Sequence, residues 1–159
     1  MKKNAKNRGW GMLEIIVVVA IIGFALTALA GLGNYALKIS SQLKNNVIAT
    51  NLAAEAIETA QAVKNENWNL LANLSEGLPY HPEKSGSPPK WVLVSGSENI
   101  NGFSRRIVLS PVLRDSNDDI ALTGNLDPQT KKITATVSWN ETGTDKQISL
   151  TVYLTNWKP

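Results

Sequence analysis

The 159-residue chain contains no cysteine and a single histidine, His81. The absence of cysteine excludes disulfide bonds, thiolate metal ligands and a cysteine nucleophile, and one histidine excludes a metal site built on a histidine cluster. Charged residues make up only 18% of the chain and apolar residues 43%. This composition excludes a disordered polyelectrolyte, and the length suits one compact domain with an appendage.

Acidic residues are absent from residues 1–9, which hold four basic residues. The chain beyond them is therefore nearly neutral, although the formal net charge of the whole is +3. The remaining charged residues are scattered and form no basic stripe. Because nucleic-acid-binding proteins use such a stripe to follow phosphates, we expect no nucleic-acid partner.

A long apolar run follows this basic segment. Between Trp10 and Leu37 the only charged residue is Glu14, and Thr27 is the only polar side chain among the nineteen residues 15–33. As an α-helix, these nineteen residues would extend about 28 Å, close to the roughly 30 Å hydrocarbon core of a bilayer. The run predicts a single membrane-spanning helix. The preceding basic residues predict a cytoplasmic N-terminus, with the bulk of the chain outside the cytoplasm.

Two ordinary alternatives share this basic start and apolar middle: a secretory signal peptide and a plain single-pass anchor. Alanine and glycine at residues 28–31 resemble a signal-peptidase site. However, the run is longer than the usual apolar core of a signal peptide. Its N-terminal edge also holds the carboxylate of Glu14, which is costly in hydrocarbon and commonly functional there.

Residues 8–23, RGWGMLEIIVVVAIIG, resemble the N-terminal signature of type IV prepilins and type II secretion pseudopilins. In that family a prepilin peptidase cuts after a glycine, the new first residue is N-methylated, and the fifth mature residue is glutamate. The resemblance implies cleavage after Gly9, methylation of Trp10, and Glu14 in the fifth position. Cleavage after Gly11 would make Glu14 the third residue of the mature chain. The fifth position of the family's glutamate therefore matches cleavage after Gly9. Trp10 stands where the family usually has phenylalanine.

The resemblance implies a filament subunit. Its partners would be other pilin or pseudopilin subunits, the prepilin peptidase, the inner-membrane assembly platform and, before assembly, membrane lipid. The residues themselves suggest how Glu14 would act, because a carboxylate at the edge of hydrocarbon needs protonation or a cationic partner. In a stack of such helices, the free amine of Trp10 would pair with Glu14 of a neighbour and fix their axial register. Major pilins commonly have proline where Gly31 stands here, which favours a minor subunit.

Residues 38–64 contain neither proline nor glycine. They carry apolar or small residues at helical spacing: Ile48, Leu52, Ala53, Ala56, Ile57, Ala60 and Val63. This stripe predicts an amphipathic helix over residues 38–65 that continues the helix of residues 10–37 and packs on a sheet. Residues 66–90 hold four prolines and predict an irregular connecting loop, with His81 as a solvent-exposed loop residue of no catalytic role.

Residues 91–159 predict an antiparallel sheet, the head of the protein. Apolar and polar residues alternate over 103–110, 133–139 and 148–155, as in strands with one buried face. Turns are predicted at residues 127–130 and 140–145. The predicted fold is α+β and pilin-like, with a long N-terminal helix, membrane-spanning in its first half, packed on a small antiparallel sheet.

The head offers few candidates for chemistry. Residues 115–119 carry carboxylates spaced as at the start of a calcium loop, but no glycine follows at the required turn, and Leu126 stands where such a loop ends in glutamate. We therefore predict a solvated acidic turn, and ion pairing for Arg105, Arg106 and Arg114. No phosphate-binding loop, histidine–acid pair or activated nucleophile occurs, so we predict no catalytic residue, metal or cofactor. The alternative function is that of a signal-anchored membrane protein with an extracellular β-rich binding module; a secreted enzyme has the weakest support.

Overall fold

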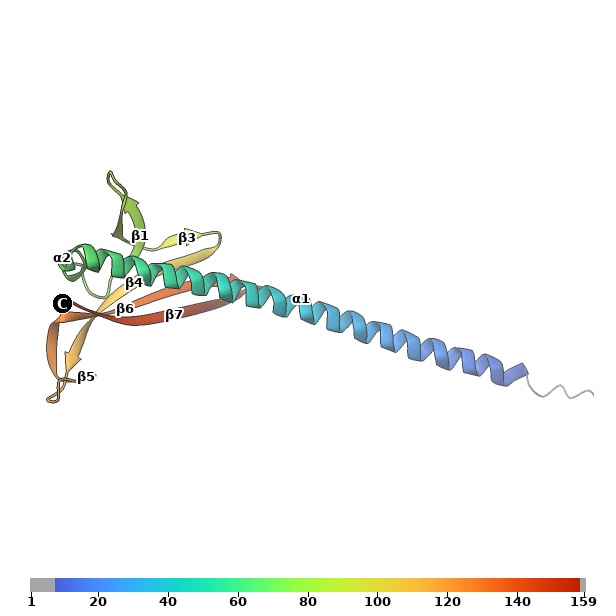
Figure 1. Cartoon of the computed structure of the whole chain (residues 1–159). Helices are drawn as coiled ribbons and strands as arrows, with labels where there is room; N and C mark the ends of the chain where they lie inside the picture. The colour runs from blue at the N-terminus through green and yellow to red at the C-terminus, as the bar shows by residue number, and fades with distance from the viewer. Residues whose placement is uncertain (1–7, 158–159) are drawn as a thin grey trace, which may run out of the picture. The chain divides into compact units, whose positions relative to one another are not determined.

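The computed structural model describes residues 8–157 (Figure 1). Contacts divide the chain into two units, Met1–Lys44 and Asn45–Pro159. Helix α1 (Arg8–Glu66) contributes residues to both. Most of the basic leader predicted over residues 1–9 lies outside the described residues.

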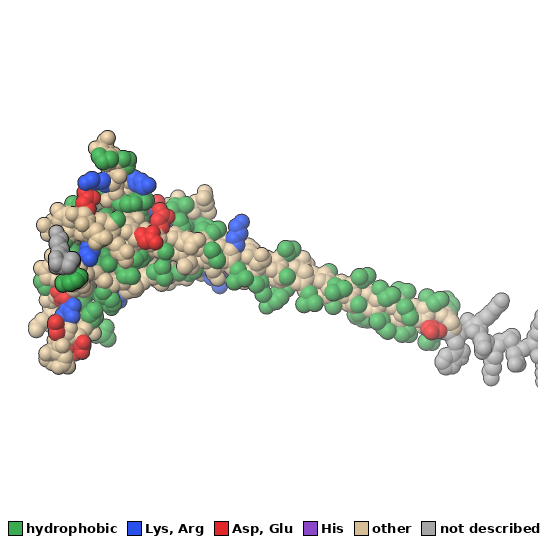
Figure 2. Space-filling model, in the orientation of Figure 1, with side chains coloured by type: hydrophobic (Ala, Val, Ile, Leu, Met, Phe, Trp, Pro, Cys, Tyr) green, Lys and Arg blue, Asp and Glu red, His purple; other side chains and the backbone are tan. Residues whose placement is uncertain are grey.

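The first unit is helical from Arg8 onward, and every described side chain from 11 to 41 is exposed. Figure 2 shows apolar side chains along its length, whereas most charged side chains gather on the second unit. Among the described residues, α1 is the one helix long and apolar enough to cross a membrane. The hydroxyl of Thr27 donates within the helix, to the carbonyl oxygens of Gly23 (3.1 Å) and Phe24 (2.9 Å). The apolar run therefore holds no unpaired hydroxyl at that position.

In the second unit, the last part of α1 packs on the sheet through the predicted stripe. Ala53, Ala56 and Ala60 are completely buried, and Ile57 is 7% exposed. Two further buried residues were not part of the predicted stripe: Ala49 and Thr59, whose hydroxyl donates to the carbonyl of Glu55. At the start of this segment, Asn45 Nδ2 donates to Glu141 Oε1 (3.1 Å).

The sheet of the second unit has seven strands in the described residues, all paired antiparallel. The main strands follow the order β2-β1-β4-β6-β7, and β3 and β5 pair with β4. Their bounds are β1 Pro79–Ser85, β2 Lys90–Ser95, β3 Glu98–Ile100, β4 Phe103–Arg114, β5 Ile120–Ala121, β6 Asn125–Glu141 and β7 Thr144–Thr155. The α+β fold predicted from the sequence, a long N-terminal helix with an antiparallel sheet, is confirmed.

The predicted alternation is confirmed in the central strands. On β4 and β6 the helix-facing residues Ile107, Leu109, Ile133 and Val137 are fully buried. On β7 the corresponding residues are only half-buried, apart from Leu154, because β7 is at the edge of the sheet. The hairpin predicted at 140–145 is also present, but its loop is shorter than predicted, because residues 140–141 and 144–145 pair within the strands. Its two central residues, Thr142 and Gly143, have positive φ angles of 48° and 81°, as a tight hairpin requires.

Two sequence predictions are wrong. Residues 66–90 are not an irregular loop, because they contain helix α2 (Trp68–Ala72) and strand β1. His81 accordingly lies on β1, paired with Val94, and is half-buried instead of exposed in a loop.

The second wrong prediction is the turn at residues 127–130, which lie inside β6. The pairing of β6 with β4 shifts there, from Pro111 opposite Lys131 to Val112 opposite Asp127. The turn-forming residues therefore make a bulge, after which strand pairing resumes.

Candidate functional site

The predicted processing and assembly residues all lie at the start of α1. The backbones of Gly9 and Trp10 are helical, and the side chain of Trp10 falls outside what the structure describes. Glu14 is exposed, and none of the described residues donates a hydrogen bond or ion pair to its carboxylate. Its pairing with the amine of Trp10 of a neighbouring chain stays a prediction.

A buried arginine joins the helix to the sheet in the second unit. Arg105 is 3% exposed and occupies a helix-facing position on β4, between Phe103 and Ile107. Its Nε donates to Glu98 Oε1 (2.7 Å) and its Nη1 to Glu55 Oε2 (3.0 Å). Nη1 also donates to the carbonyl oxygen of Leu52 on α1 (3.2 Å). The guanidinium therefore connects β4, the adjoining strand β3 and α1.

The neighbouring arginine behaves as strand geometry requires. Arg106 points to the opposite face of the sheet and is exposed. The ion pairing predicted for Arg105 is confirmed, whereas the described residues provide no carboxylate for Arg106.

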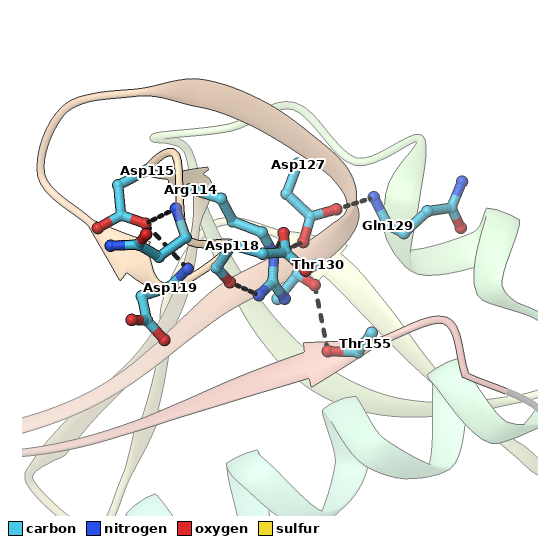
Figure 3. Close-up of polar contacts among 9 residues, drawn as sticks. Arg114, Asp115, Asp118, Asp119, Asp127, Gln129, Thr130 and Thr155 are labelled. Carbon is cyan, nitrogen blue, oxygen red and sulfur yellow. Dashed lines mark hydrogen bonds and ion pairs between the residues drawn. The ribbon is translucent and has the colours of Figure 1, made fainter.

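The acidic turn at residues 115–119 is held by its own backbone (Figure 3). The carboxylate of Asp115 accepts from the N–H groups of Asn117 (2.8 Å) and Asp119 (3.1 Å). Asp118 has a positive φ of 66°, a conformation that aspartate tolerates better than most residues. Within residues 8–157, no group of three or more His, Cys, Asp or Glu side chains is arranged to hold a metal ion.

Arg114 fastens this turn to the bulge of β6. Its Nε donates to Asp127 Oδ2 (2.7 Å), and its Nη1 donates to the carbonyl of Asp118 (2.6 Å), as Figure 3 shows. The ion pairing predicted for Arg114 is therefore confirmed. Close packing here also requires glycine at residue 124, where a Cβ atom would lie 2.0 Å from the carbonyl oxygen of Arg114.

Asp127 is the centre of this small network. The Thr130 hydroxyl lowers the pKa of the Asp127 carboxyl most, followed by the Arg114 guanidinium and the N–H of Gln129. Thr130 is itself buried, 3.1 Å from the hydroxyl of Thr155 on β7. The hydrogen bond to Asp127 correspondingly raises the pKa of Arg114. The two charged groups of this network, Arg114 and Asp127, are therefore paired with each other within the fold.

These contacts predict a pH effect on stability. Because the pKa of Asp127 is lower in the folded chain than its ordinary value of 3.8, its stabilising contribution is present above that value and is lost as the pH falls through the folded pKa. We expect Asp127→Asn to be less stable than the unmodified chain at neutral pH, and the difference to shrink below about pH 4. Denaturant unfolding at several pH values measures this; a difference independent of pH would contradict it. Asp145→Asn, on the exposed hairpin, is the control.

Sequence reasoning found the arginines of these clusters but missed their partners. The inward position of Arg105 in an otherwise apolar series was a usable signal, because a buried cation must have acidic partners. Glu55 and Glu98 are 50 and 7 residues away along the chain, so only the fold identifies them.

Comparison with protein-family models, with curated proteins and with solved structures gives no match.

Proposed function

We propose that this chain is a structural subunit, of the minor kind, of a type IV pilus or a type II secretion-like filament. In this proposal prepilin peptidase cuts it after Gly9, and it polymerises through its N-terminal helix. The observation that carries the proposal is the first unit. It is a helix with apolar side chains exposed around it, and Glu14 is the single charged residue between 11 and 37.

Such a helix needs an apolar environment. Ile16, Phe24 and Leu29 are 61%, 77% and 63% exposed, and they lie on different sides of the helix. Burying each of these side chains is worth about 1.5–3 kcal/mol. A bilayer supplies this burial to the single chain, and the packed helices of other subunits supply it in a filament. The same apolar helix thus serves both stages, first in the membrane and then in the filament core.

The two stages differ in what Glu14 requires. At the membrane edge the carboxylate is hydrated or protonated, whereas in a filament core it needs a cation. Cleavage after Gly9 creates one, the amine of Trp10. Pairing between neighbouring chains fixes how far one helix is shifted along the next, because only one stagger brings the two groups together. The head then lies on the outside of the filament, beyond the cytoplasmic membrane.

The mass of the mature chain tests this proposal. We expect protein taken from its native membrane to begin at Trp10 and to carry one added methyl group, as measured from the intact mass and the N-terminal peptide. A chain that begins at Met1 would contradict processing and indicate an anchored binding module. A chain that begins near residue 31 would indicate ordinary secretion.

Two matched variants sharpen the measurement. Gly9→Val should block cleavage, whereas Gly11→Val should leave it unchanged, since the register assigns cleavage to Gly9. Gly11 has open space around its Cα, so a side chain there meets no other described atom. Equal cleavage of both variants would contradict the assignment.

A further inference from the structure

The main strand order of the sheet ends in β2 on one side and in β7 on the other. These two edge strands differ in length and in the residues that flank them. β2 is six residues long, follows the prolines Pro88 and Pro89, starts with Lys90 and is followed by Gly96. β7 is twelve residues long and pairs with β6 at every residue from Thr144 to Thr155, with no shift of register. Its other side is free: within the part of the chain that the structure describes, no backbone or side-chain group pairs with the outward N–H and C=O groups of β7.

This free edge lacks the features that usually prevent strand pairing. Natural edge strands are short, or carry lysine, proline or a bulge. In β7 the charged residues, Asp145 and Lys146, lie at the hairpin end, and residues 147–157 contain no charge, proline or glycine. In an antiparallel ladder every second residue directs its N–H and C=O away from the partner strand. β7 therefore presents a regular row of unpaired backbone groups over its length.

We propose that the outer edge of β7 binds an extended segment of a different polypeptide, which adds a strand to the sheet. Main-chain hydrogen bonds would provide the affinity, and the side chains beside the edge set the chemistry of the partner. Ile148, Leu150 and Val152 line the helix-facing side and are half-buried. On the opposite side Ser149 and Thr151 are exposed. The matching partner is an uncharged segment in which aliphatic residues alternate with serine or threonine.

A second copy of the chain offers the same alternation on its own β7, but the geometry of the pairing argues against it. Antiparallel pairing of two β7 strands about a twofold axis would run the two helix segments 45–66 in opposite directions. A filament in which all subunits share one orientation does not allow this, so the choice of a different polypeptide rests in part on the proposed function. The edge itself does not depend on N-terminal processing.

The test uses the full chain in detergent micelles and a synthetic peptide that copies residues 147–155, with lysines added at both ends for solubility. This peptide has the required alternation. The control peptide has the same composition with the alternation scrambled. Hydrogen exchange of the free chain first shows which of Leu150 and Thr151 directs its N–H outward, because that amide exchanges faster.

We expect saturable binding of the alternating peptide, with slower exchange of every second amide along β7, and no binding of the scrambled peptide.

Proline at the outward one of residues 150 and 151 should leave the fold intact, because that N–H makes no bond within the sheet, and should weaken peptide binding at least tenfold. Proline at the inward one should instead unfold the edge. Absence of binding, or binding unaffected by the outward proline, would overturn the proposal. Dimerisation of the chain through β7, abolished by the same proline, would also overturn it and make a second copy the partner. These results do not depend on the mass measurement that tests the proposed function. The strand-addition proposal and the proposed function can therefore each fail without the other.

Discussion

Glu14→Ala is expected to reduce incorporation of the chain into filaments at least tenfold while leaving its insertion into the membrane unchanged. The variant loses the one charge of the apolar segment, so membrane insertion meets no added cost. Assembly would lose the contact that sets the stagger between neighbouring helices. The measurement is the amount of the chain in sheared filaments against the amount in membranes, in its native host.

Two companion variants isolate the charge. Glu14→Gln keeps the shape of the side chain and should fail to assemble as Glu14→Ala does, because it removes the carboxylate. Thr27→Val should assemble normally, because the Thr27 hydroxyl is already bonded to its own helix. Normal assembly of Glu14→Ala would refute the register argument.

Glu98→Ala is expected to destabilise the second unit by about 1.5–3 kcal/mol, the usual contribution of a hydrogen bond between charged groups, and not by the full cost of a wholly unpaired buried charge. The side chain of Arg105 is only 4% exposed, and its Nε and Nη2 atoms each lie 2.7 Å from Glu98 Oε1. Glu55 would remain as a partner, but it is 47% exposed and contacts one nitrogen. Reversible denaturant unfolding followed by tryptophan fluorescence measures the free energy of unfolding.

Substitution of the arginine itself should destabilise the second unit far less. Arg105→Met removes the buried charge and leaves Glu55 and Glu98 at positions that water reaches, so we expect a loss of no more than about 1 kcal/mol. Glu66→Ala breaks an exposed ion pair with Lys90 and should also cost less than about 1 kcal/mol. If Arg105→Met proved more damaging than Glu98→Ala, the arginine would matter for its packing and not for its charge.

The fold could be predicted from the sequence where one residue pattern has one structural meaning. Alanines at helical spacing marked the buried side of α1, and strict alternation marked β4 and β6, because both patterns follow directly from side-chain geometry. Strand β1 was missed because Pro79 and Pro82 argue against a strand. The structure shows why they are tolerated: β1 pairs with β4 only at residues 79 and 80, so Pro82 faces an open edge on that side.

The bulge and the ion-pair clusters show a second reason for failure. Asp127 and Pro128 have the chemistry of a turn, and Asp127 does accept from the N–H of Gln129 (2.9 Å). Whether strand pairing resumes afterwards depends on β4, which lies elsewhere in the sequence. The partners of Arg105 and Arg114 are likewise set by the tertiary fold. The sequence alone therefore indicated that these arginines form ion pairs, but not which carboxylates they contact.

The contact between Asn45 and Glu141 has a consequence for biosynthesis. The two residues are 96 positions apart, and Leu52 and Arg105 are 53 apart. At about 5–20 residues per second, a ribosome needs roughly 5–20 s to add the residues between Asn45 and Glu141. During that time the alanine stripe of α1 has no strands to cover it. The nascent chain is therefore exposed to proteases and aggregation until its last third is made. A chain truncated before β6 would keep this stripe uncovered and would stay open to the same degradation.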